Sequence, residues 1–206
     1  MKISVCASDA QWDELTANRP GADWQRVDNY HDFNKYTDAD AFFCLQQEFD
    51  ATAFKILNKP VFVNSVQNSL ATINAPANVL RINGWPTFLN RQNWEIAGTL
   101  NEQAIAVFKI LHIKLQVVAD EPGFIAARVV AMIINEAYFA LGEDVSSKNE
   151  IDIAMKLGTN YPYGPFEWAA MIGEKNILSL LQKLSESDTR YQPATMLQEE
   201  VKKKSV

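Results

Sequence analysis

The sequence is poor in the residues from which disulfide frameworks and metal centres are built. Two cysteines and two histidines occur among its 206 residues, so a zinc site would need mostly carboxylate ligands, and we expect no metal. Both cysteines, Cys6 and Cys44, lie in apolar, strand-like runs, which indicates buried thiols in a reducing compartment. Glycine and proline, with eight residues each, are too scarce for a collagen-like or low-complexity chain.

Positive charge and long apolar runs are also scarce. The net charge of −6 argues against a nucleic-acid-binding protein, which needs a basic face. The most apolar stretch, Phe124 to Leu141, contains Arg128, Asn135 and Glu136, so it is typical of a helix buried inside a protein and not of a membrane span. The apolar run after Lys2 is too short for a secretory signal, and we expect a cytoplasmic protein.

Up to about residue 118, short β-branched and aromatic runs alternate with helix-like segments. The expected strands are Lys2–Ala7, Trp24–Asp28, Ala41–Leu45, Pro60–Asn64, Val79–Ile82, Trp94–Ala97 and Leu115–Val118. Helices are expected over Ala51–Leu57 and Asn101–Leu111, and Thr99 and Glu102 have the spacing of a capping box at the start of the second helix. Strands that alternate with helices predict a mostly parallel sheet covered on both faces.

From Glu121 onward the pattern is helical only. The Phe124–Leu141 segment is apolar nearly all round, which predicts a central helix packed on several sides. Ser147 and Glu150 form a second capping box, and Gly158 is expected to end the helix that they begin. The other expected features are a rigid turn at Tyr161–Pro165, helices over Phe166–Ile172 and Ile177–Leu184, and a frayed, charged tail over Glu199–Val206.

The change of pattern falls near Asp120–Gly123, where proline and glycine interrupt the chain. It predicts two domains, residues 1–119 and residues 120–206. The expected fold class is therefore α/β followed by all-α.

Four motifs in the second half carry a resemblance to a known family. They are Glu121–Arg128 (EPGFIAAR), Asn135–Ala137 (NEA), Ile151–Gly158 (IDIAMKLG) and Tyr161–Glu167 (YPYGPFE). In this order and spacing, the segment resembles the C-terminal helical domain of the L-3-hydroxyacyl-CoA dehydrogenases. The resemblance implies a domain that closes over an acyl-CoA and whose helices form a homodimer interface. The first half looks like a shortened, diverged form of the family's Rossmann-like NAD-binding domain.

The resemblance implies NAD, but the residues after the first strand do not support it. A G-x-G-x-x-G turn would let the backbone approach the pyrophosphate, whereas Cys6–Trp12 contains no glycine and Asp9 would repel the phosphates. We therefore expect no cofactor. Asp28 occupies the place of the acidic residue that binds the ribose in such folds; the alternative is that Asp28 caps the following turn.

The family's catalytic base is a histidine that a glutamate twelve residues later orients. When Glu95 is aligned with that glutamate, Asn83 stands at the histidine position. A carboxamide accepts no proton near pH 7, so Asn83 can hydrogen-bond a substrate oxygen but cannot act as a general base. Glu95 is then interpreted as a structural hydrogen-bond acceptor. His31 and His112 are interpreted as surface or cap residues.

Two further family positions are altered. The loop Asn64–Leu70 resembles the family's substrate loop and places Asn68 or Ser69 at its active-site serine, and the family's asparagine before Arg128 is Ala127 here. Arg128 and Glu136 lie eight residues apart on one helix face, which predicts an internal ion-pair network, with a ligand role as the alternative. The aromatic residues Trp85, Phe88 and Trp94 fit either an acyl site or a core.

Two hypotheses of function follow. The first is a degenerate, non-catalytic member of the dehydrogenase family that binds, dimerises or regulates in acyl-CoA and fatty acid metabolism. The second is an active NAD(H)-dependent oxidoreductase on a 3-hydroxyacyl-CoA or related hydroxy acid, with an altered cofactor loop. The sequence favours the first because it needs no replacement base. The expected partners are an acyl-CoA-like small molecule and a second copy of the chain, with neither a membrane nor a nucleic acid.

Overall fold

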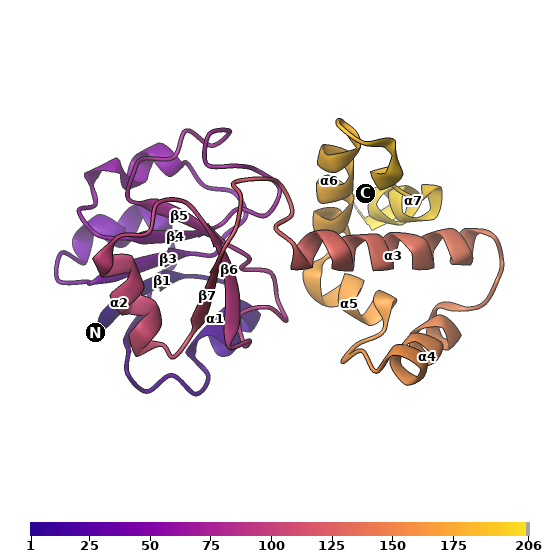
Figure 1. Ribbon diagram of the computed structural model, residues 1–206, viewed down its shortest axis with the longest axis horizontal. Coiled ribbons are helices and arrows are strands. Elements are labelled where there is room, and N and C mark those ends of the chain that lie inside the picture. The colour runs from indigo at the N-terminus through magenta and orange to yellow at the C-terminus, as the bar shows by residue number, and fades with distance from the viewer. Residues whose placement is uncertain (205–206) are drawn as a thin grey trace. The chain divides into compact units, whose positions relative to one another are not determined.

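The computed structural model describes residues 1–204. The chain divides between Phe124 and Ile125 into two compact units (Figure 1). Residues up to Phe124 are called the sheet unit below, and residues from Ile125 onward the helical unit. None of the helices among the described residues combines the length and the apolar character that crossing a bilayer needs.

The sheet unit is built on seven strands within the described residues. They are β1 (Lys2–Cys6), β2 (Asp23–Arg26), β3 (Ala41–Cys44), β4 (Val61–Asn64), β5 (Val79–Ile82), β6 (Asn93–Ala97) and β7 (Lys114–Val117). Their order across the sheet is β2-β1-β3-β4-β5-β6-β7, and neighbours pair in parallel except β5 and β6. This mostly parallel sheet, followed by helices, confirms the predicted fold class.

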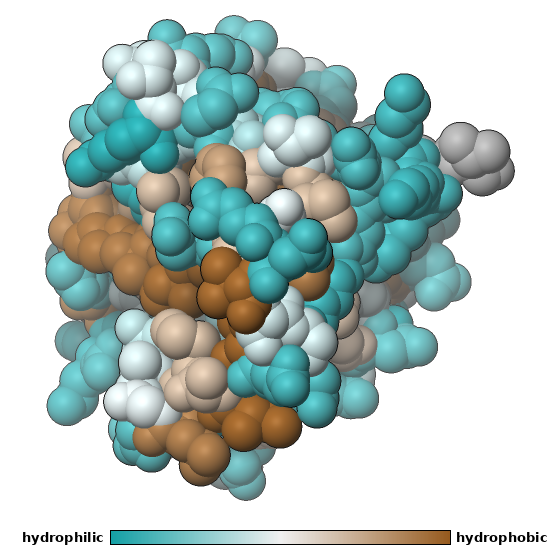
Figure 2. All heavy atoms as spheres, turned by 90° about the vertical axis from the view of Figure 1, so that its right-hand side faces the viewer, coloured by the Kyte–Doolittle hydropathy of each residue, from teal (hydrophilic) through white to brown (hydrophobic). Residues whose placement is uncertain are grey.

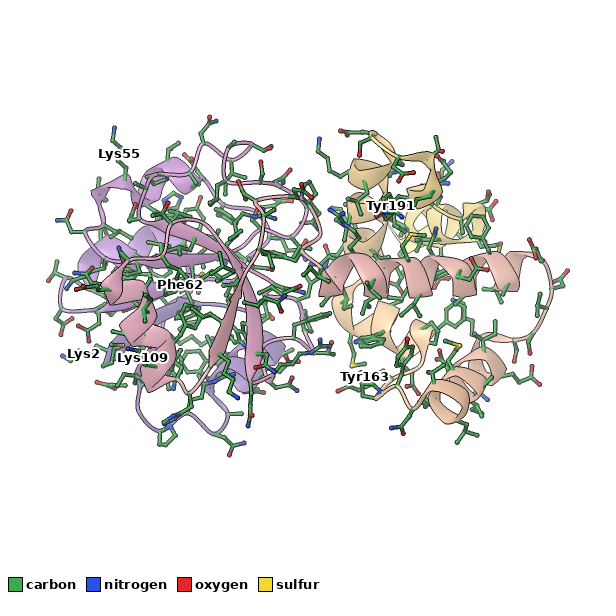
Figure 3. The ribbon with its side chains drawn as sticks, in the orientation of Figure 1. Lys2, Lys55, Phe62, Lys109, Tyr163 and Tyr191 are labelled. Carbon is green, nitrogen blue, oxygen red and sulfur yellow. The ribbon has the colours of Figure 1, made fainter. Side chains whose placement is uncertain are left out.

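Both faces of the sheet are covered, but by different kinds of helix. The α-helices α1 (Asp9–Thr16) and α2 (Glu102–Ile110) contribute Leu15 and Phe108 to one core, where Phe62 lies against Phe108 (Figure 3). The short 3₁₀ helices η1 (Tyr30–Lys35) and η2 (Ala51–Ile56) cover the other face with Phe33 and Phe54. Successive β3 residues alternate between the two cores, as side chains on a strand must.

Three local expectations for the sheet unit need correction. The Ala51–Leu57 segment is 3₁₀ and not α-helical. The N-cap of α2 is Asn101, whose side chain accepts from the backbone N–H of Ala104 at 2.8 Å, so the proposed Thr99 capping box is wrong. Helix α1 was not expected at all, although Ser8 and Gln11 form a capping box at its start.

The two cysteines lie opposite each other on neighbouring strands. Cys6 of β1 and Cys44 of β3 are in register, and both are free, buried thiols. Burial raises the pKa of Cys6 to about 11 and raises the pKa of Cys44 further. The prediction of buried thiols is confirmed.

The helical unit contains five α-helices among the described residues. They are α3 (Ala126–Gly142), α4 (Lys148–Thr159), α5 (Pro165–Ile172), α6 (Glu174–Ser185) and α7 (Thr195–Lys204), with the 3₁₀ turn η3 (Thr189–Tyr191) before α7. Helix α3 packs against α5, α6 and α7. One face of α3 buries residues such as Val130 and Ile134, whereas Val129 and Phe139 are exposed on the other. The prediction of a central helix packed on several sides is confirmed by these three contacts, and one face of the helix remains exposed.

The start of α4 follows the prediction, but its end does not. The Ser147 hydroxyl accepts from the Glu150 N–H, and the Glu150 carboxylate accepts from the Ser147 N–H at 3.2 Å. Hydrogen bonds from Ser147 and Ser146 lower the pKa of Glu150 to about 2. Gly158 lies inside the helix, which ends at Thr159 and has as its C-cap Asn160, a left-handed residue with φ of 57°. Asparagine tolerates this conformation through its short polar side chain.

The Tyr161–Glu167 motif is shaped by a carboxylate from the preceding helix. Asp152 of α4 is buried and accepts from the N–H groups of Phe166, at 2.8 Å, and Glu167, at 3.1 Å. It thereby caps the first turn of α5, where Pro165 has no N–H to satisfy. Gly164 lies against this carboxylate, and a Cβ added there would come within 2.3 Å of the Asp152 Cγ.

The C-terminal tail is a packed helix as far as the structure describes it. Leu197 of α7 is fully buried, and Glu200 pairs with Lys148 of α4 at 2.5 Å. Lys204 pairs with Glu174 of α6 at 2.6 Å. The expectation that residues from Glu199 onward fray is wrong for residues 199–204, and residues 205–206 lie outside the described part.

Alanine substitutions at two glycines, one beside the Asp152 carboxylate and one away from it, test the contribution of the Asp152 cap to stability. We expect Gly164→Ala to lower the free energy of unfolding by about 1–3 kcal/mol, because the new methyl group overlaps the Asp152 carboxylate. Gly158→Ala is the matched control: its Cβ would meet no heavy atom within 4 Å in the described part, and alanine is the better helix former, so a gain of up to about 1 kcal/mol is expected. Urea unfolding followed by circular dichroism measures both, and equal effects would contradict the cap.

Candidate functional site

The order of the strands marks where a ligand is expected. Strands β1 and β3 are neighbours, and the chain proceeds from β1 to β2 on one side and from β3 to β5 on the other. In open parallel sheets, ligands bind at this reversal point, outside the carboxyl ends of the strands. The crevice to consider thus lies beyond Cys6 and Cys44, where the β1–α1 connection begins.

The side chain of Gln11 fills this position. Gln11 is the third residue of α1 and is only 6% exposed. Its Nε2 donates to the carbonyl oxygens of Leu45, at 2.9 Å, and Gly84, at 2.7 Å, while its Oε1 accepts from the Ser8 N–H at 3.1 Å. One amide therefore joins the carboxyl-end loops of β1, β3 and β5.

A second amide extends this arrangement. Asn64, at the end of β4, donates from Nδ2 to the Leu45 carbonyl at 3.1 Å and accepts from the Gly84 N–H at 3.1 Å. A Cβ on Gly84 would approach the Asn64 Cβ to 2.8 Å, so glycine is needed for the close packing. Gln11 and Asn64, with the Leu45 and Gly84 backbone groups that they bind, are called the amide cluster below.

Charged side chains also disfavour the binding of an anion at the N-terminus of α1. Asp9, the first residue of the helix, pairs with Arg26 at 2.6 Å, and Arg26 also donates to the Ala7 carbonyl at 3.1 Å. The helix N-terminus thus already has a carboxylate, and the nearby cation is engaged with it. With Gln11 in the crevice and the Ser8 N–H bonded to it, these residues do not fit the pyrophosphate of a dinucleotide.

Asn83 directly follows β5, and Glu95 lies on the neighbouring antiparallel strand β6. Strands β5 and β6 pair Arg81 with Ala97 and Ile82 with Ile96, and one further step in this register sets Asn83 opposite Glu95. Asn83 is 7% exposed, and its Oδ1 accepts from the Trp85 N–H at 3.3 Å. Its Nδ2 is buried and donates to no acceptor among the described residues. The position therefore offers a buried hydrogen-bond donor and no proton acceptor.

The loop that contains Asn68 and Ser69 uses its polar groups to hold its own shape. The Ser65 hydroxyl donates to the Asn68 carbonyl at 2.9 Å, while the Asn68 side chain is exposed. The Ser69 hydroxyl lies 2.9 Å from that of Thr72 and accepts from the Thr72 N–H. Ser69 thus serves as the cap of a turn.

Sequence reasoning missed a buried cation beneath this loop. Arg81 of β5 is fully buried and donates to the Ser65 carbonyl at 2.8 Å and to Asp120 at 2.5 Å. Asp120 also accepts from the Leu70 N–H at 2.9 Å, so the ion pair fixes both ends of the loop. Burial lowers the pKa of Arg81, and Asp120 opposes this shift. A single arginine in an otherwise apolar strand was the available signal, because a buried charge requires a partner.

The remaining predicted positions are not members of the amide cluster. Asp28 is exposed beyond β2, and the cap of the following turn is Asn29, which accepts from the His31 N–H at 2.9 Å; the reading of Asp28 as that cap is wrong. His31 is exposed and its ring lies 4.2 Å from that of Tyr30, while His112 follows α2 in the left-handed conformation. Both remain surface or cap residues.

The remaining apolar candidates for the site are buried inside their own units. Ala127 is fully buried in the first turn of α3. Trp94 packs on Phe43 and Phe108 and is therefore a core residue; Trp85 and Phe88 are also buried. Within the described residues, no three His, Cys, Asp or Glu side chains group closely enough to hold a metal ion.

The amide cluster predicts an unusual sensitivity at Gln11. Gln11→Ala removes the side-chain donor to the Gly84 carbonyl and one of the two side-chain donors to the Leu45 carbonyl, so we expect a loss of about 1–3 kcal/mol in the free energy of unfolding. The same substitution at the exposed Gln47 should change it by less than about 0.5 kcal/mol. Chemical denaturation of both variants is the measurement. A Gln11→Ala variant as stable as Gln47→Ala would show that the cluster contributes nothing.

Comparisons with known proteins agree with the helical motifs. Residues 123–206 match the family described as 3-hydroxyacyl-CoA dehydrogenase, C-terminal domain. A 3-hydroxyadipyl-CoA dehydrogenase of Escherichia coli is 49% identical over 84 residues, which are 40% of this chain and 18% of that protein. A 3-hydroxybutyryl-CoA dehydrogenase of Bradyrhizobium diazoefficiens is 44% identical over 80 residues, 38% of this chain and 27% of that protein. The matched stretch thus spans less than a third of these relatives.

Similarity in structure extends over both units. The crystal structure of an (S)-3-hydroxybutyryl-CoA dehydrogenase from Ralstonia eutropha superimposes with a TM-score of 0.68 and 26% identity, covering 86% of this chain and 69% of that one. A 3-hydroxybutyryl-CoA dehydrogenase from Escherichia coli gives a TM-score of 0.55 and 31% identity over 81% of this chain and 32% of that one. Residues 123–206, which include the whole helical unit, therefore match the C-terminal domain of the 3-hydroxyacyl-CoA dehydrogenases.

Proposed function

We propose that this chain is a non-catalytic relative of the 3-hydroxyacyl-CoA dehydrogenases, which acts as a binding, dimerising or regulatory protein in acyl-CoA and fatty acid metabolism. The observation that carries the proposal is the Gln11 side chain, which occupies the reversal point of the sheet and bonds to Leu45 and Gly84. The same crevice cannot hold both this amide and a pyrophosphate. The two free, buried thiols are in keeping with a cytoplasmic location.

Oxidation of a 3-hydroxyacyl group needs two acceptors at once. The hydride needs a nicotinamide held against the carbon, and the hydroxyl proton needs a base. Around the amide cluster the chain offers Gln11 and the Asp9–Arg26 pair where the phosphates would bind. At the base position it offers Asn83, whose amide accepts no proton near pH 7. Both requirements are therefore unmet, and Ala127 removes a further polar contact that the resemblance implies.

The buried amide of Asn83 supports binding without turnover. Its Nδ2 lacks an acceptor within the described residues, and a buried donor without an acceptor is costly. The carbonyl oxygen of an acyl thioester or of a 3-keto group is an acceptor that fits this donor. An acyl-CoA-like molecule is accordingly the small-molecule ligand that we propose.

A second candidate is an active NAD(H)-dependent oxidoreductase on a 3-hydroxyacyl-CoA or related hydroxy acid. The pairing of Asn83 with Glu95 across β5 and β6, and the exposed carboxylate of Asp28 beyond β2, favour it. It requires a dinucleotide site outside the Cys6–Trp12 segment and a base other than Asn83.

Calorimetric titration with NADH separates the two candidates. For the non-catalytic protein we expect no saturable heat below about millimolar NADH, because the phosphate contacts are missing and Asp9 repels the anion. A thermal-shift series with acyl-CoAs on the same sample should instead raise the melting temperature. A micromolar affinity for NADH would contradict the proposal and support the enzyme.

Restoring the base alone should not restore the reaction. We expect no NADH formation from L-3-hydroxybutyryl-CoA by the wild-type chain or by Asn83→His. A correctly placed base is worth about 10² to 10⁴ in rate, but only when the hydride acceptor is already positioned. Absorbance at the NADH band measures both proteins beside a complete family dehydrogenase as positive control. Activity of Asn83→His within about tenfold of that control would overturn the proposal.

The proposed macromolecular partner is a second copy of the chain. The motivation is the apolar residues that α3 leaves exposed, together with the dimerising role that the resemblance implies. An obligate interface of this kind buries more than about 2,000 Å² in total.

A further inference from the structure

A pocket of about 410 Å³ opens between the two 3₁₀ helices of the sheet unit. Phe33 of η1 and Phe42 of β3 line it, and both are buried, with their ring centroids 4.9 Å apart. Ile56, the last residue of η2, lines it from the other side with the adjacent Leu57, although Ile56 is 68% exposed. Ligand pockets have this size and this mainly apolar lining. We call the pocket that these residues form the 3₁₀ pocket.

The 3₁₀ pocket also has an unpaired cation in its lining. Lys59, in the connection from η2 to β4, is half-buried and lines the pocket. Its ammonium group pairs with no carboxylate among residues 1–204, whereas the nearby Lys35 of η1 pairs with Asp32 at 2.7 Å. A positive charge beside low-dielectric walls concentrates its field in the pocket. The pocket therefore attracts a ligand that carries negative charge.

Two carboxamides add hydrogen-bond donors to this charge. Asn34 and Asn58 line the 3₁₀ pocket and are exposed, and their side chains form no hydrogen bond with the described residues. Each carboxamide offers two N–H groups, and an ionised carboxylate only accepts hydrogen bonds. A single lysine is a compact point charge that suits one negative charge, whereas planar, bidentate recognition of phosphate favours arginine. The polar lining thus fits a carboxylate head group.

The 3₁₀ pocket lies at the opposite end of the sheet from the amide cluster. Ala39 and Lys59, which line the pocket, precede β3 and β4. Leu45 and Asn64 of the amide cluster lie at the carboxyl ends of the same two strands. Each strand has four residues with a rise of about 3.3 Å per residue, so the two sites are separated by about 10 Å or more. A ligand in the 3₁₀ pocket leaves the amide cluster free.

A second hollow, on the helical unit, has a different charge pattern. It lies along α3, where Val129 and Met132 line it together with Arg128 and Glu136. Figure 2 shows apolar residues gathered in patches between hydrophilic ones on the face that it presents. Glu136 is exposed, so the internal ion-pair network predicted from the sequence is wrong at this residue. Its carboxylate would repel an anionic head group, so this hollow does not select the ligand that suits the 3₁₀ pocket.

We propose that the 3₁₀ pocket binds a monocarboxylate with an apolar chain, of the chemical class of a medium-chain fatty acid. The chain lies on Phe33 and Phe42 and is covered by Ile56. The carboxylate accepts hydrogen bonds from the Lys59 ammonium group and the Asn58 carboxamide. This site is additional to the acyl-CoA-like site proposed at Asn83 and does not depend on it.

Titration with sodium octanoate locates the site. In nuclear magnetic resonance spectra of the ¹⁵N-labelled full chain, the amide signals of Tyr36, Thr37 and Asn58 should shift in a saturable way, while that of Gly84 in the amide cluster should not. Hexanoate should bind about 15-fold more weakly, because each buried CH₂ contributes about fourfold. Octan-1-ol has the same chain without the charge and should bind at least about tenfold more weakly than octanoate, since hydrogen bonds to charged groups are the stronger ones.

A matched pair of lysines tests the head group. Lys59→Met keeps a long side chain but removes the charge, and it should raise the Kd for octanoate at least about tenfold. The Lys59 carbonyl still accepts from the Asn78 side chain, so the fold is retained. Lys55 of η2 is exposed and extends away from the sheet unit (Figure 3). It does not line the pocket, and Lys55→Met should leave the Kd unchanged.

The outcomes separate this site from the proposed function. If octanoate shifts only the Asn83 and Gly84 amides, the 3₁₀ pocket is overturned while the acyl-CoA-like site stands. Equal affinities for octanoate and octan-1-ol, or a Lys59→Met variant with the wild-type Kd, would overturn recognition of the carboxylate. The absence of any saturable shift would overturn the whole proposal. Saturation at the Tyr36 and Asn58 amides that Lys59→Met weakens and Lys55→Met does not supports it.

Discussion

The hydrogen bonds of the Gln11 amide determine what the sheet unit can do. The carbonyl groups of Leu45 and Gly84 lie where the strands end, and buried carbonyls need donors. In a nucleotide-binding fold, the N–H groups of the first turn point at a phosphate. Here the Ser8 N–H points at Gln11, and Gln11 in turn satisfies the two carbonyls. The carboxyl ends of these strands are thus linked by side-chain hydrogen bonds from α1, which braces the loops that follow β1, β3 and β5.

The sheet was predictable from the sequence because of how its strands are buried. Strands β3 and β4 are buried along their whole length, and strands covered on both faces read as continuous apolar runs. The sequence did not indicate helix α1, because this helix buries only Gln11 and Leu15 and has no apolar periodicity. The 3₁₀ helix η2 was mistaken for an α-helix because a six-residue segment carries too little periodicity to separate the two.

The candidate site was predictable only where it depends on pairing of neighbouring strands. β5 and β6 are adjacent antiparallel strands, and their register, continued by one step beyond the pair of Ile82 and Ile96, sets Asn83 opposite Glu95. The carbonyl groups that accept from Gln11 belong to Leu45 and Gly84, which lie 34 and 73 residues further along the chain. A local sequence pattern cannot indicate partners at such distances. The same holds for Arg81 and Asp120, which are 39 residues apart. The exposed face of α3 could not be predicted either, because the apolar character of the helix does not indicate which of its sides other helices cover.

Asp152 couples two helices that would otherwise be able to open separately. Its side chain belongs to α4, yet its acceptor atoms satisfy the first N–H groups of α5. Melting α4 therefore uncaps α5, and unwinding the first turn of α5 leaves a buried carboxylate without donors. The two helices form one cooperative element of local unfolding. Hydrogen exchange at the Phe166 and Glu167 amides consequently reports the opening of a helix to which neither residue belongs.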